Sequence, residues 1–586
     1  MSTALEAASL IMIPTSYSDG LLASVKPNDG AGDFTFTRGS NISATRVNAD
    51  GNIEKGYENL LTYSNNFSQW TKAATTATSG QSGYDGSSDA WLIEKSNPNG
   101  VIYKSLSSIS VGTISVYAKA SASNWMAIYT GTSLMFFNLA NGVLGGGSGE
   151  IDYKIEAVSG ATGWYRCSVV DTSITSFSIY PAEGDGDRSG TSGSILLQDA
   201  MLNQGLVAYP YVETTTAPVA AGILEDMPRI DFSGGNQSLL LEPSRTNETP
   251  HSEYYDVFLN YGTGKCTFTP NAAISPEGFQ NSFKAVLNSN QQNGGGAIST
   301  RMRRFTQGAI ITFSMFFKAD EFDQVILGGF FQNESATFNL KDGSVVSQAS
   351  NVIDAYSIPF GNGWYRCVVT YTFQDGIGNG YLYSGFRVVA ISDGVSSVGD
   401  GVKGLFAYGV QFEEATYPTS YIPTYGVSQT RLADVCNDAG DASTFNSTEG
   451  VLYAEVAALD SELTYKEISL SDGTSSNRIE IRYLQNKIEF TARISGVAEV
   501  YANFTPTSVF DFNKIALRYN GTNFKLYVNG SLEASETSVN TFSANTLNSA
   551  QFNSGAGASV FYGNAKQVLV FPTALSDDAC ITLTTI

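Results

Sequence analysis

Short runs of alternating apolar and polar residues recur along the whole chain, and clusters of Gly, Asn, Asp, Ser and Pro separate them. A period of two predicts half-buried β-strands, whereas runs of Ala, Leu, Glu and Lys at helical spacing are scarce. In the stretch 514–530, Phe524, Leu526 and Val528 fall on one face of a strand between two Asn-Gly turns. The pattern therefore predicts an all-β protein built from short strands and polar turns.

An internal repeat organises a large part of the chain. The sequence Gly-Trp-Tyr-Arg-Cys at 163–167 recurs at 363–367, and three further matches keep the same order. These matches pair 115–120 with 314–319, 137–142 with 338–343, and Leu202, Tyr211 and Thr214 with Phe412, Tyr421 and Thr424. Anchors in one order and with nearly constant spacing predict one fold that is used twice.

The Gly-Trp-Tyr-Arg-Cys strand has two different faces. Alternation places Tyr165, Cys167 and Val169 on one face, and Trp164 and Arg166 on the other. The second copy repeats this arrangement at the equivalent positions. The two matching cysteines are therefore interpreted as buried packing thiols, without a base or cation that would activate them.

Several stretches carry a resemblance to known families. They are 58–64 with Phe67 and Trp70, the Gly-Trp-Tyr-Arg-Cys strand, 410–424, and the stretches 33–40, 45–48, 228–232, 239–247 and 430–434. Together they resemble the jelly-roll, carbohydrate-binding-module-like domains of bacteriophage tail and head-fibre proteins. The strand pair that ends at 525–530 resembles the laminin-G or concanavalin A-like lectin sandwich. The first copy departs from the pattern, because its exit at 202–205 lacks the acidic pair Glu413-Glu414.

The expected architecture is a pair of tandem jelly-roll β-sandwiches followed by a concanavalin A-like, laminin-G-like sandwich. The expected division is an N-terminal virion-docking segment at 1–56, jelly rolls at 57–221 and 239–435 with a connector at 222–238 between them, and the lectin-like domain at 436–586. The resemblance implies a virion component that contacts a host-surface glycan, usually as a homotrimer.

Composition and charge exclude several classes of function. The 586 residues are enough for three or four domains, and the net charge of −22 repels nucleic acids and anionic membrane surfaces. No apolar run is long enough for membrane insertion. The five cysteines are too few for a disulfide scaffold, and the first ten residues lack the basic region of a signal peptide. These features are typical of a chain made in a reducing cytosol, and the resemblance to phage fibre proteins implies assembly in the host cytoplasm and a final location in the virion.

The sequence offers little for catalysis, and we expect no enzyme and no catalytic residue. His251 is the only histidine, and its Thr-Pro-His-Ser-Glu context is typical of a surface loop rather than a catalytic triad. A glycosidase needs two carboxylates that face one cleft. Glu413 and Glu414 are neighbours on a strand, so their side chains point to opposite faces.

Glycan binding needs an aromatic surface beside polar donors. The main candidates are Trp164 with Arg166 and Trp364 with Arg366, and the alternative for both pairs is packing inside the sandwich. Secondary candidates are Trp125, which follows Asn124, and Tyr254 with Tyr255.

An oxygen-rich turn precedes the last strands of the first copy. Glu183, Asp185 and Asp187 alternate with glycines there, which fits either a Ca²⁺ site or a solvated turn. No other cofactor is expected.

The leading hypothesis is a non-enzymatic bacteriophage tail or head fibre or spike that binds a host cell-surface glycan and docks on other tail or capsid proteins. One alternative is a purely structural capsid or tail decoration fibre. A second is a polysaccharide-degrading tailspike.

Overall fold

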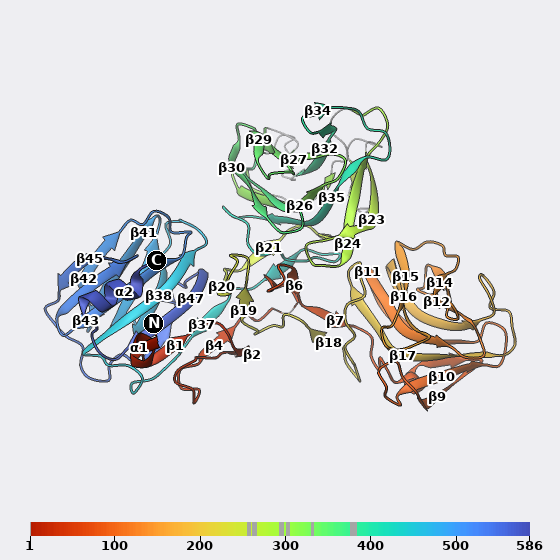
Figure 1. Cartoon of the computed structure of the whole chain (residues 1–586), viewed down its shortest axis with the longest axis horizontal. Helices are drawn as coiled ribbons and strands as arrows, with labels where there is room; N and C mark the ends of the chain where they lie inside the picture. Colours follow the sequence, from red (N-terminus) through yellow and green to blue (C-terminus); the bar gives the residue numbers. More distant parts are fainter. Residues whose placement is uncertain are drawn as a thin grey trace. The chain divides into compact units, whose positions relative to one another are not determined.

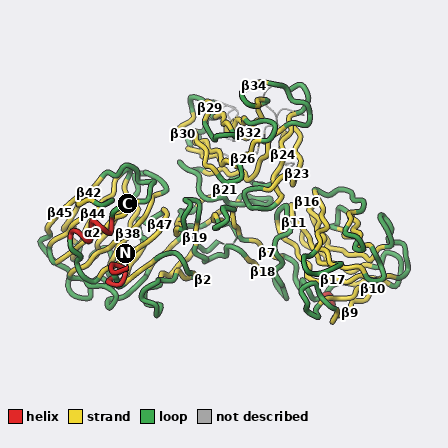
Figure 2. Tube along the Cα trace, in the orientation of Figure 1, coloured by secondary structure: helices red, strands yellow, loops and turns green. Residues whose placement is uncertain are grey.

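Strands make up most of the computed structural model, with short helices near the ends of the chain (Figures 1 and 2). The structure describes residues 2–40, 42–254, 259–260, 266–291, 298–299, 305–329, 333–374 and 384–586. The predicted all-β class is confirmed. The chain forms two units, of which unit 1 comprises Met1–Glu54, Ile223–Arg245 and Thr430–Ile586, and unit 2 comprises Lys55–Gly222 and Thr246–Gln429.

Unit 1 is a sandwich of two antiparallel sheets. The first sheet has the order β19 (Arg229–Asp231), β20 (Ser238–Leu241), β47 (Gly563–Phe571), β38 (Glu449–Ala458), β43 (Asn513–Asn520), β44 (Asn523–Val528) and β45 (Ser531–Thr537), and β1 (Leu10–Met12) also pairs with β47. The second sheet has the order β42 (Val497–Phe504), β41 (Lys487–Ile494), β40 (Arg478–Leu484), β39 (Lys466–Ser471) and β46 (Ser549–Gln551). One hydrophobic core fills the space between the two sheets.

The strand alternation explains the layers of unit 1. Phe524, Leu526 and Val528 enter the core between the sheets, as predicted. Tyr527 faces the other way and packs with Cys580 of α2 (Asp577–Thr584), which covers the outer surface of the first sheet with α1 (Ser2–Ala7). The Ser576 side chain caps α2 by accepting a hydrogen bond from the Ala579 amide at 3.2 Å.

The structure corrects the expected boundaries at the start and in the middle of the chain. Residues 1–56 and 222–238 do not form a separate docking segment and a connector, because both contribute strands to the sandwich of unit 1. Ile11 pairs with Leu569 of β47, and Ile230 pairs with Leu239 of β20, which itself pairs with β47. The long strand β47 thus has one edge shared between β1 and β20, which satisfies backbone groups that would otherwise form an open sheet edge.

The remaining strands of unit 1 are short and flank the sandwich. One small sheet has the order β2 (Tyr17–Ser18), β3 (Leu21–Leu22), β4 (Phe34–Thr37) and β37 (Val435–Asn437), and a second pairs β5 (Thr45–Val47) with β6 (Ile53–Lys55).

Five of the charged residues in the family-like stretches meet in one buried cluster, the arginine hub, which consists of Arg38, Arg229, Glu242, Arg431 and Asp434. Arg229 binds both Glu242, at 2.7 Å, and Asp434. Asp434 also binds Arg38 at 3.1 Å, and Glu242 binds Arg431 at 3.0 Å. The hub therefore joins the three passes of the chain through unit 1, which explains why these stretches carry charged residues inside apolar surroundings.

The first jelly roll of unit 2 is built around two long strands, β11 (Val101–Ala120) and β16 (Trp164–Ala182), which pair with each other along most of their length. Its strand order is β14 (Val143–Leu144), β13 (Leu134–Asn138), β12 (Trp125–Tyr129), β16, β11, β17 (Gly193–Gln204), β10 (Ala90–Lys95) and β9 (Thr75–Gln81). In addition, β15 (Asp152–Ala157) pairs with β16, β8 (Thr71–Ala73) pairs with β11, β7 (Tyr57–Asn59) pairs with β18 (Val219–Ala221), and the short helix η1 (Phe67–Gln69) follows β7.

The second jelly roll has two main sheets. One has the order β23 (Cys266–Ile274), β24 (Gln280–Leu287), β35 (Gly404–Glu413), β26 (Ile310–Ala319), β31 (Trp364–Thr372) and β30 (Val352–Pro359). The other has the order β29 (Val345–Gln348), β28 (Ser335–Asn339), β27 (Gln324–Gly329) and β32 (Ser384–Val389). Short pairs are β22 (Leu259–Asn260) with β25 (Ile298–Ser299), β33 (Ile391–Ser392) with β34 (Val395–Ser396), and β21 (Arg245–Asn247) with β36 (Gln429–Arg431).

The register of the strands confirms the duplication. Cys167 lies opposite Val116 in the first copy, and Cys367 lies opposite Met315 in the second. Both cysteines are fully buried in the cores, as predicted.

Equivalent hydrogen bonds at the entry of the two copies support the same conclusion. The Asn59 amide donates to the Val212 carbonyl at 2.7 Å, and Asn247 donates to the Ile422 carbonyl at 2.8 Å. These contacts fix the entry of each jelly roll to its exit, so the matched positions at the two ends have a structural role.

A second buried ionic cluster, the lysine cluster, joins the two jelly rolls within unit 2. Lys55 binds Glu253 at 2.7 Å and also binds Glu277, and all three residues are buried. The Lys55 ammonium also donates to the Tyr425 hydroxyl at 2.8 Å, and Tyr209 of the first jelly roll donates to Glu277 at 3.4 Å. The two carboxyl groups thus share one cation in buried surroundings, and burial together with the neighbouring Glu277 raises the pKa of Glu253.

Candidate functional site

The tryptophans of the repeated strand are inside the protein. Trp164 is 4% exposed and Trp364 is 2% exposed, and the Trp364 indole donates to the Ile274 carbonyl at 3.1 Å. A sugar ring cannot stack on a buried side chain. The structure therefore corrects their interpretation as glycan platforms and supports the packing alternative.

Arg166 and Arg366, which share a strand face with these tryptophans, also make contacts within the protein. Arg166 donates to the Ala208 carbonyl at 3.2 Å and lies 5.5 Å from the centre of the Tyr117 ring. Arg366 donates from Nη2 to the Ser314 hydroxyl at 2.9 Å and is 8% exposed. The two arginines stabilise equivalent places in the two copies rather than an exposed binding surface.

Those secondary glycan candidates that the structure describes also pack against other apolar residues. Trp125 is half-buried in a small apolar cluster with Phe136 and Tyr180, and Gly145 lies so close that a Cβ there would be 2.7 Å from its ring. Tyr254 is buried in the core of the second jelly roll. Tyr255 lies outside the described residues.

The acidic turn of the first copy does not converge on a single point. Glu183 pairs with Lys95, Asp185 accepts a hydrogen bond from the Gly146 amide at 2.6 Å, and Asp187 accepts one from the Ser189 amide at 2.8 Å. Throughout the described part of the chain, no three His, Cys, Asp or Glu residues are grouped as a metal site would require. The arrangement matches the solvated-turn alternative.

His251 and Glu413 have positions that account for them structurally. His251 is half-buried, and burial lowers the pKa of its imidazole. Glu413 is buried and accepts a hydrogen bond from the Thr419 amide at 3.0 Å, while Glu414 is exposed. Glu413 thus holds the exit loop of the second jelly roll, and the two acids do not share a cleft.

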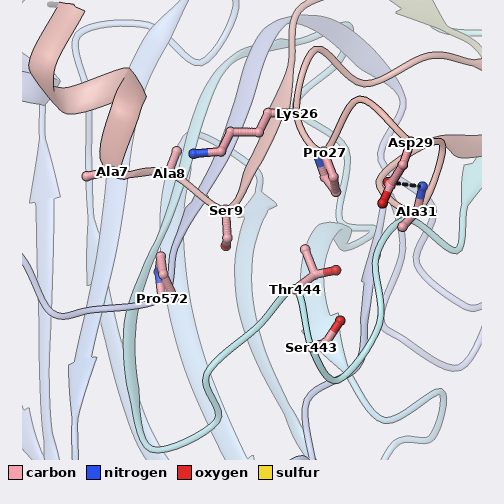
Figure 3. A pocket seen from close by; sticks show the side chains of 10 residues that line it. All are labelled: Ala7, Ala8, Ser9, Lys26, Pro27, Asp29, Ala31, Ser443, Thr444 and Pro572. Carbon is pink, nitrogen blue, oxygen red and sulfur yellow. Dashed lines mark hydrogen bonds between the residues drawn. The ribbon is translucent and has the colours of Figure 1, made fainter.

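A pocket of about 380 Å³ lies in unit 1, where the N-terminal stretch packs beside the loop that carries Ser443 and Thr444 (Figure 3). Its lining consists mainly of small residues. Lys26, the cation in this lining, donates to the Glu6 carbonyl at 2.8 Å and so satisfies a backbone group near the end of α1. The pocket marks a junction between chain segments, and its polar side chains are those of Ser9, Lys26, Asp29, Ser443 and Thr444.

A different surface combines exposed aromatic rings with fixed charges. We name it the outer face, the side of β39–β42 that points away from the core of unit 1. Ile468, Ile481 and Phe490 of these strands point into the core, so the residues that alternate with them lie on the outer face. The outer face includes Tyr465, Glu467, Arg478, Glu480, Arg482, Lys487, Glu489, Thr491, Arg493, Glu499, Tyr501 and Asn503.

Arg482 is the centre of the outer face. Its guanidinium carbon lies 4.4 Å from the centre of the Tyr465 ring and 5.6 Å from that of the Tyr501 ring. Its Nε binds Glu489 at 2.8 Å, and the Tyr501 hydroxyl donates to the same carboxylate at 2.8 Å. Tyr465 is 41% exposed and Tyr501 is 51% exposed, so both rings remain open to solvent. The guanidinium is thereby fixed between two accessible rings.

Beside this group lies a buried pair of carboxyl groups. Glu480 binds Arg478 at 2.7 Å and accepts a hydrogen bond from the Thr491 hydroxyl at 2.6 Å. Glu467 lies beside Glu480, and burial together with the charge of Glu480 raises the pKa of Glu467 to about 8. Glu467 is therefore largely protonated at neutral pH.

The segment 553–561 covers one end of the outer face. The Ser559 carbonyl accepts a hydrogen bond from the Glu467 amide at 2.9 Å, and the Ser554 carbonyl accepts one from Arg478 at 3.1 Å. Gly555 lies against Ser471, where a Cβ would come within 2.5 Å of the serine Cβ. The end with Arg482 and the two tyrosines remains uncovered.

The sequence analysis did not identify this site. The alternation of Arg478, Glu480 and Arg482 with apolar residues is visible in the sequence, but the same pattern describes an ordinary solvated strand face. Tyr465 and Tyr501 are far apart in sequence, and only strand pairing brings them to the two sides of one arginine.

Comparisons with known proteins assign the fold of the C-terminal sandwich. Residues 456–579 match the family model of the concanavalin A-like lectin/glucanases superfamily, so the predicted concanavalin A-like domain is confirmed. The match includes the whole outer face from Tyr465 to Asn503. No curated protein sequence matches the chain significantly.

Partial matches to solved structures include bacterial proteins and a leech protein. The CBM40 domain of the Ruminococcus gnavus IT-sialidase bound to α2,3-sialyllactose is 18% identical, with 26% of this chain and 94% of that chain covered and a TM-score of 0.23. The leech intramolecular trans-sialidase is 19% identical, with 24% of each chain covered and a TM-score of 0.22. The botulinum neurotoxin serotype G binding domain is 14% identical, with coverages of 26% and 39% and a TM-score of 0.22. At these identities and TM-scores, the similarities assign no ligand to this chain.

None of the helices within the described residues is long and apolar enough to cross a membrane.

Proposed function

We propose that the chain is a bacteriophage virion protein, a tail or head fibre or spike, whose C-terminal sandwich binds a glycan on the host surface without cleaving it. The virion role is supported by the stretches that resemble phage fibre proteins. Many of their charged residues lie in the arginine hub, where they hold unit 1 together. Homotrimer formation and docking on tail or capsid proteins belong to the same proposal.

The observation that carries glycan binding is the open pair of rings, Tyr465 and Tyr501, on either side of Arg482. Sugar rings pack their C–H faces on aromatic side chains, and their hydroxyls need polar groups that are already held in place. Glu489 and Asn503 supply such groups, because Glu489 is fixed by Arg482, and Asn503 is exposed beside the Tyr501 hydroxyl at 3.4 Å.

Two features of the carboxyl pair support binding without turnover. Glu467 and Glu480 are 3% and 1% exposed, and they lie close enough together for the charge of Glu480 to raise the pKa of Glu467. Hydrolysis of a glycosidic bond requires two carboxyl groups that reach the bond from separate positions. The alternative of a polysaccharide-degrading spike is tested by incubating the purified chain with host polysaccharide, and the release of oligosaccharides would establish it.

The test of glycan binding uses point substitutions in the full chain. Deleting 436–586 is unsuitable, because it would remove β47, the partner of β1 and β20. We expect Tyr465→Ala and Tyr501→Ala each to weaken binding on a glycan array and to host cells by about tenfold, since truncating an aromatic anchor costs on the order of 1–2 kcal/mol.

Phe510→Ala is the matched control, because Phe510 is an exposed aromatic residue (54%) in the connection between β42 and β43. It should leave glycan binding unchanged. Thermal unfolding of all three variants separates lost binding from lost folding. Equal binding by the tyrosine variants and the unsubstituted chain would refute the assignment to the outer face.

The virion role has its own test. Mass spectrometry of purified particles and labelling with an antibody against the chain should place it on a tail or capsid, and light scattering should give the mass of a trimer. Particles that adsorb normally with Tyr465 and Tyr501 both substituted would favour the purely structural alternative.

A further inference from the structure

Arg482 has hydrogen-bonding capacity that the protein does not use. Its Nε binds Glu489 at 2.8 Å, but among the described residues none accepts a hydrogen bond from its Nη1 or Nη2. The side chain is 15% exposed, so part of the guanidinium reaches solvent. The two nitrogens at the end of a guanidinium form a planar fork that matches the two oxygens of a carboxylate or a sulfate.

The fork is held in place before any ligand arrives. The rings of Tyr465 and Tyr501 lie on either side of the guanidinium, and Glu489 holds its Nε. A side chain that is already ordered loses little conformational entropy on binding, which makes its hydrogen bonds more effective. The same two rings offer the C–H stacking surface that a sugar needs.

The charge around the fork also favours an anion. Glu489 and Glu480 are neutralised by Arg482 and Arg478 at 2.8 and 2.7 Å. Glu467 keeps its proton at neutral pH, because burial and Glu480 raise its pKa to about 8. The outer face thus presents four cationic side chains, Arg478, Arg482, Lys487 and Arg493, against the three carboxyl groups of Glu480, Glu489 and Glu499, in a chain whose net charge is −22.

We propose that the ligand of the outer face is an acidic saccharide, whose carboxylate or sulfate group is bound by the Nη nitrogens of Arg482 while its sugar ring stacks on Tyr465 or Tyr501. This inference rests on the proposed glycan-binding function and adds the chemical class of the ligand. Acidic groups of this kind occur on uronic and sialic acids and on sulfated sugars, and these sources are separated by the choice of probe.

The experiment measures binding of the full chain to matched pairs of saccharides by titration calorimetry. The pairs are sialyllactose and lactose, oligogalacturonate and its methyl ester, and κ-carrageenan oligosaccharide and its desulfated form. We expect the acidic member of at least one pair to bind at least tenfold more tightly, because a hydrogen bond to a charged group contributes about 1.5–3 kcal/mol. The pair that shows this preference identifies the acidic group.

Three variants assign the preference to the fork. Arg482→Gln should abolish it, and Arg482→Lys, which keeps the charge but loses the planar fork, should retain only part of it. Arg493→Gln removes another cation of the outer face, whose own Nη1 is already bound to the Gly496 carbonyl at 2.8 Å, and should keep the preference. Thermal unfolding of each variant confirms that the sandwich is intact.

Each other result overturns a specific claim. Equal binding of acidic and neutral members refutes the acidic ligand and leaves glycan binding standing. If Arg493→Gln reduces the preference for the acidic saccharide as much as Arg482→Gln does, general charge attraction explains the preference and the role of the Arg482 fork is refuted. Binding of no saccharide in any pair and none on the glycan array refutes both this inference and the proposed function.

Discussion

Neutralising Asp434 is expected to destabilise unit 1 more than removing Arg229, although each change deletes one charge from the arginine hub. The hub holds three guanidinium groups and two carboxylates, with Arg229 and Asp434 both fully buried. Asp434→Asn would leave three buried cations around the single carboxylate of Glu242. Arg229→Met would instead leave two matched pairs, Arg38 with Asp434 and Arg431 with Glu242.

The magnitudes follow from this imbalance. Leaving buried charges uncompensated costs about 3–5 kcal/mol, whereas replacing a charge by an apolar side chain while the others remain paired costs about 1–2 kcal/mol. Asp434 also accepts a hydrogen bond from the Glu242 amide at 2.8 Å, which asparagine retains only in part. Burial, with a smaller contribution from the neighbouring Arg229 and Arg431, lowers the pKa of Arg38 to about 10 despite its contact with Asp434.

Differential scanning calorimetry of the full chain measures both variants. A change of 1 kcal/mol shifts the midpoint of a unit of this size by about 2–4 °C, so we expect a decrease of about 6–20 °C for Asp434→Asn and of about 2–8 °C for Arg229→Met. The transition of unit 2 should not move. A decrease for Arg229→Met that equals or exceeds that of Asp434→Asn would refute the charge-balance argument.

The remaining predictions concern buried ionisable groups. Because burial and Glu480 raise the pKa of Glu467 to about 8, the folded state keeps a proton that the unfolded chain loses near pH 4.5. The free energy of unfolding of unit 1 should therefore fall as the pH rises from about 5 to about 8. Glu467→Gln should flatten this pH dependence, which is measured by thermal unfolding at a series of pH values. Lys55→Met should lower the stability of unit 2 by about 3–5 kcal/mol, and adding Glu253→Gln should recover part of the loss in a double-mutant comparison; full additivity would contradict the shared cluster. The five cysteines are all buried, so a thiol reagent should label none in the native chain and all five in denaturant, and rapid native labelling of Cys167 would show that its core opens.

Part of the fold was predictable because it depends on local patterns. The matched Gly-Trp-Tyr-Arg-Cys strands predicted two copies of one module, and Cys167 and Cys367 do lie at equivalent core positions. The alternation around Leu526 predicted which side chains enter the core of the lectin-like sandwich. A side-chain period of two is a property of a single strand, so it can be detected without knowing the strand's partners.

The candidate site could not be predicted in the same way. Trp164 and Trp364 have the residue type of a glycan platform, but other chain segments cover them, and such cover is not encoded in the strand itself. Tyr465, Arg482 and Tyr501 come from separate stretches, and their stacking depends on the register of strands β39 to β42.

The sequence by itself determined the all-β class, the duplicated jelly roll and the faces of individual strands, because each follows from side-chain alternation and turn residues over a few positions. Only the tertiary structure decided that Leu10–Met12 and Arg229–Asp231 complete the C-terminal sandwich, that Arg38, Arg229 and Asp434 share one buried hub, and that Arg482 lies between two open rings. Those features depend on contacts between residues far apart in the chain, and the energy of a buried charge or an exposed ring is set by neighbours that local sequence does not specify.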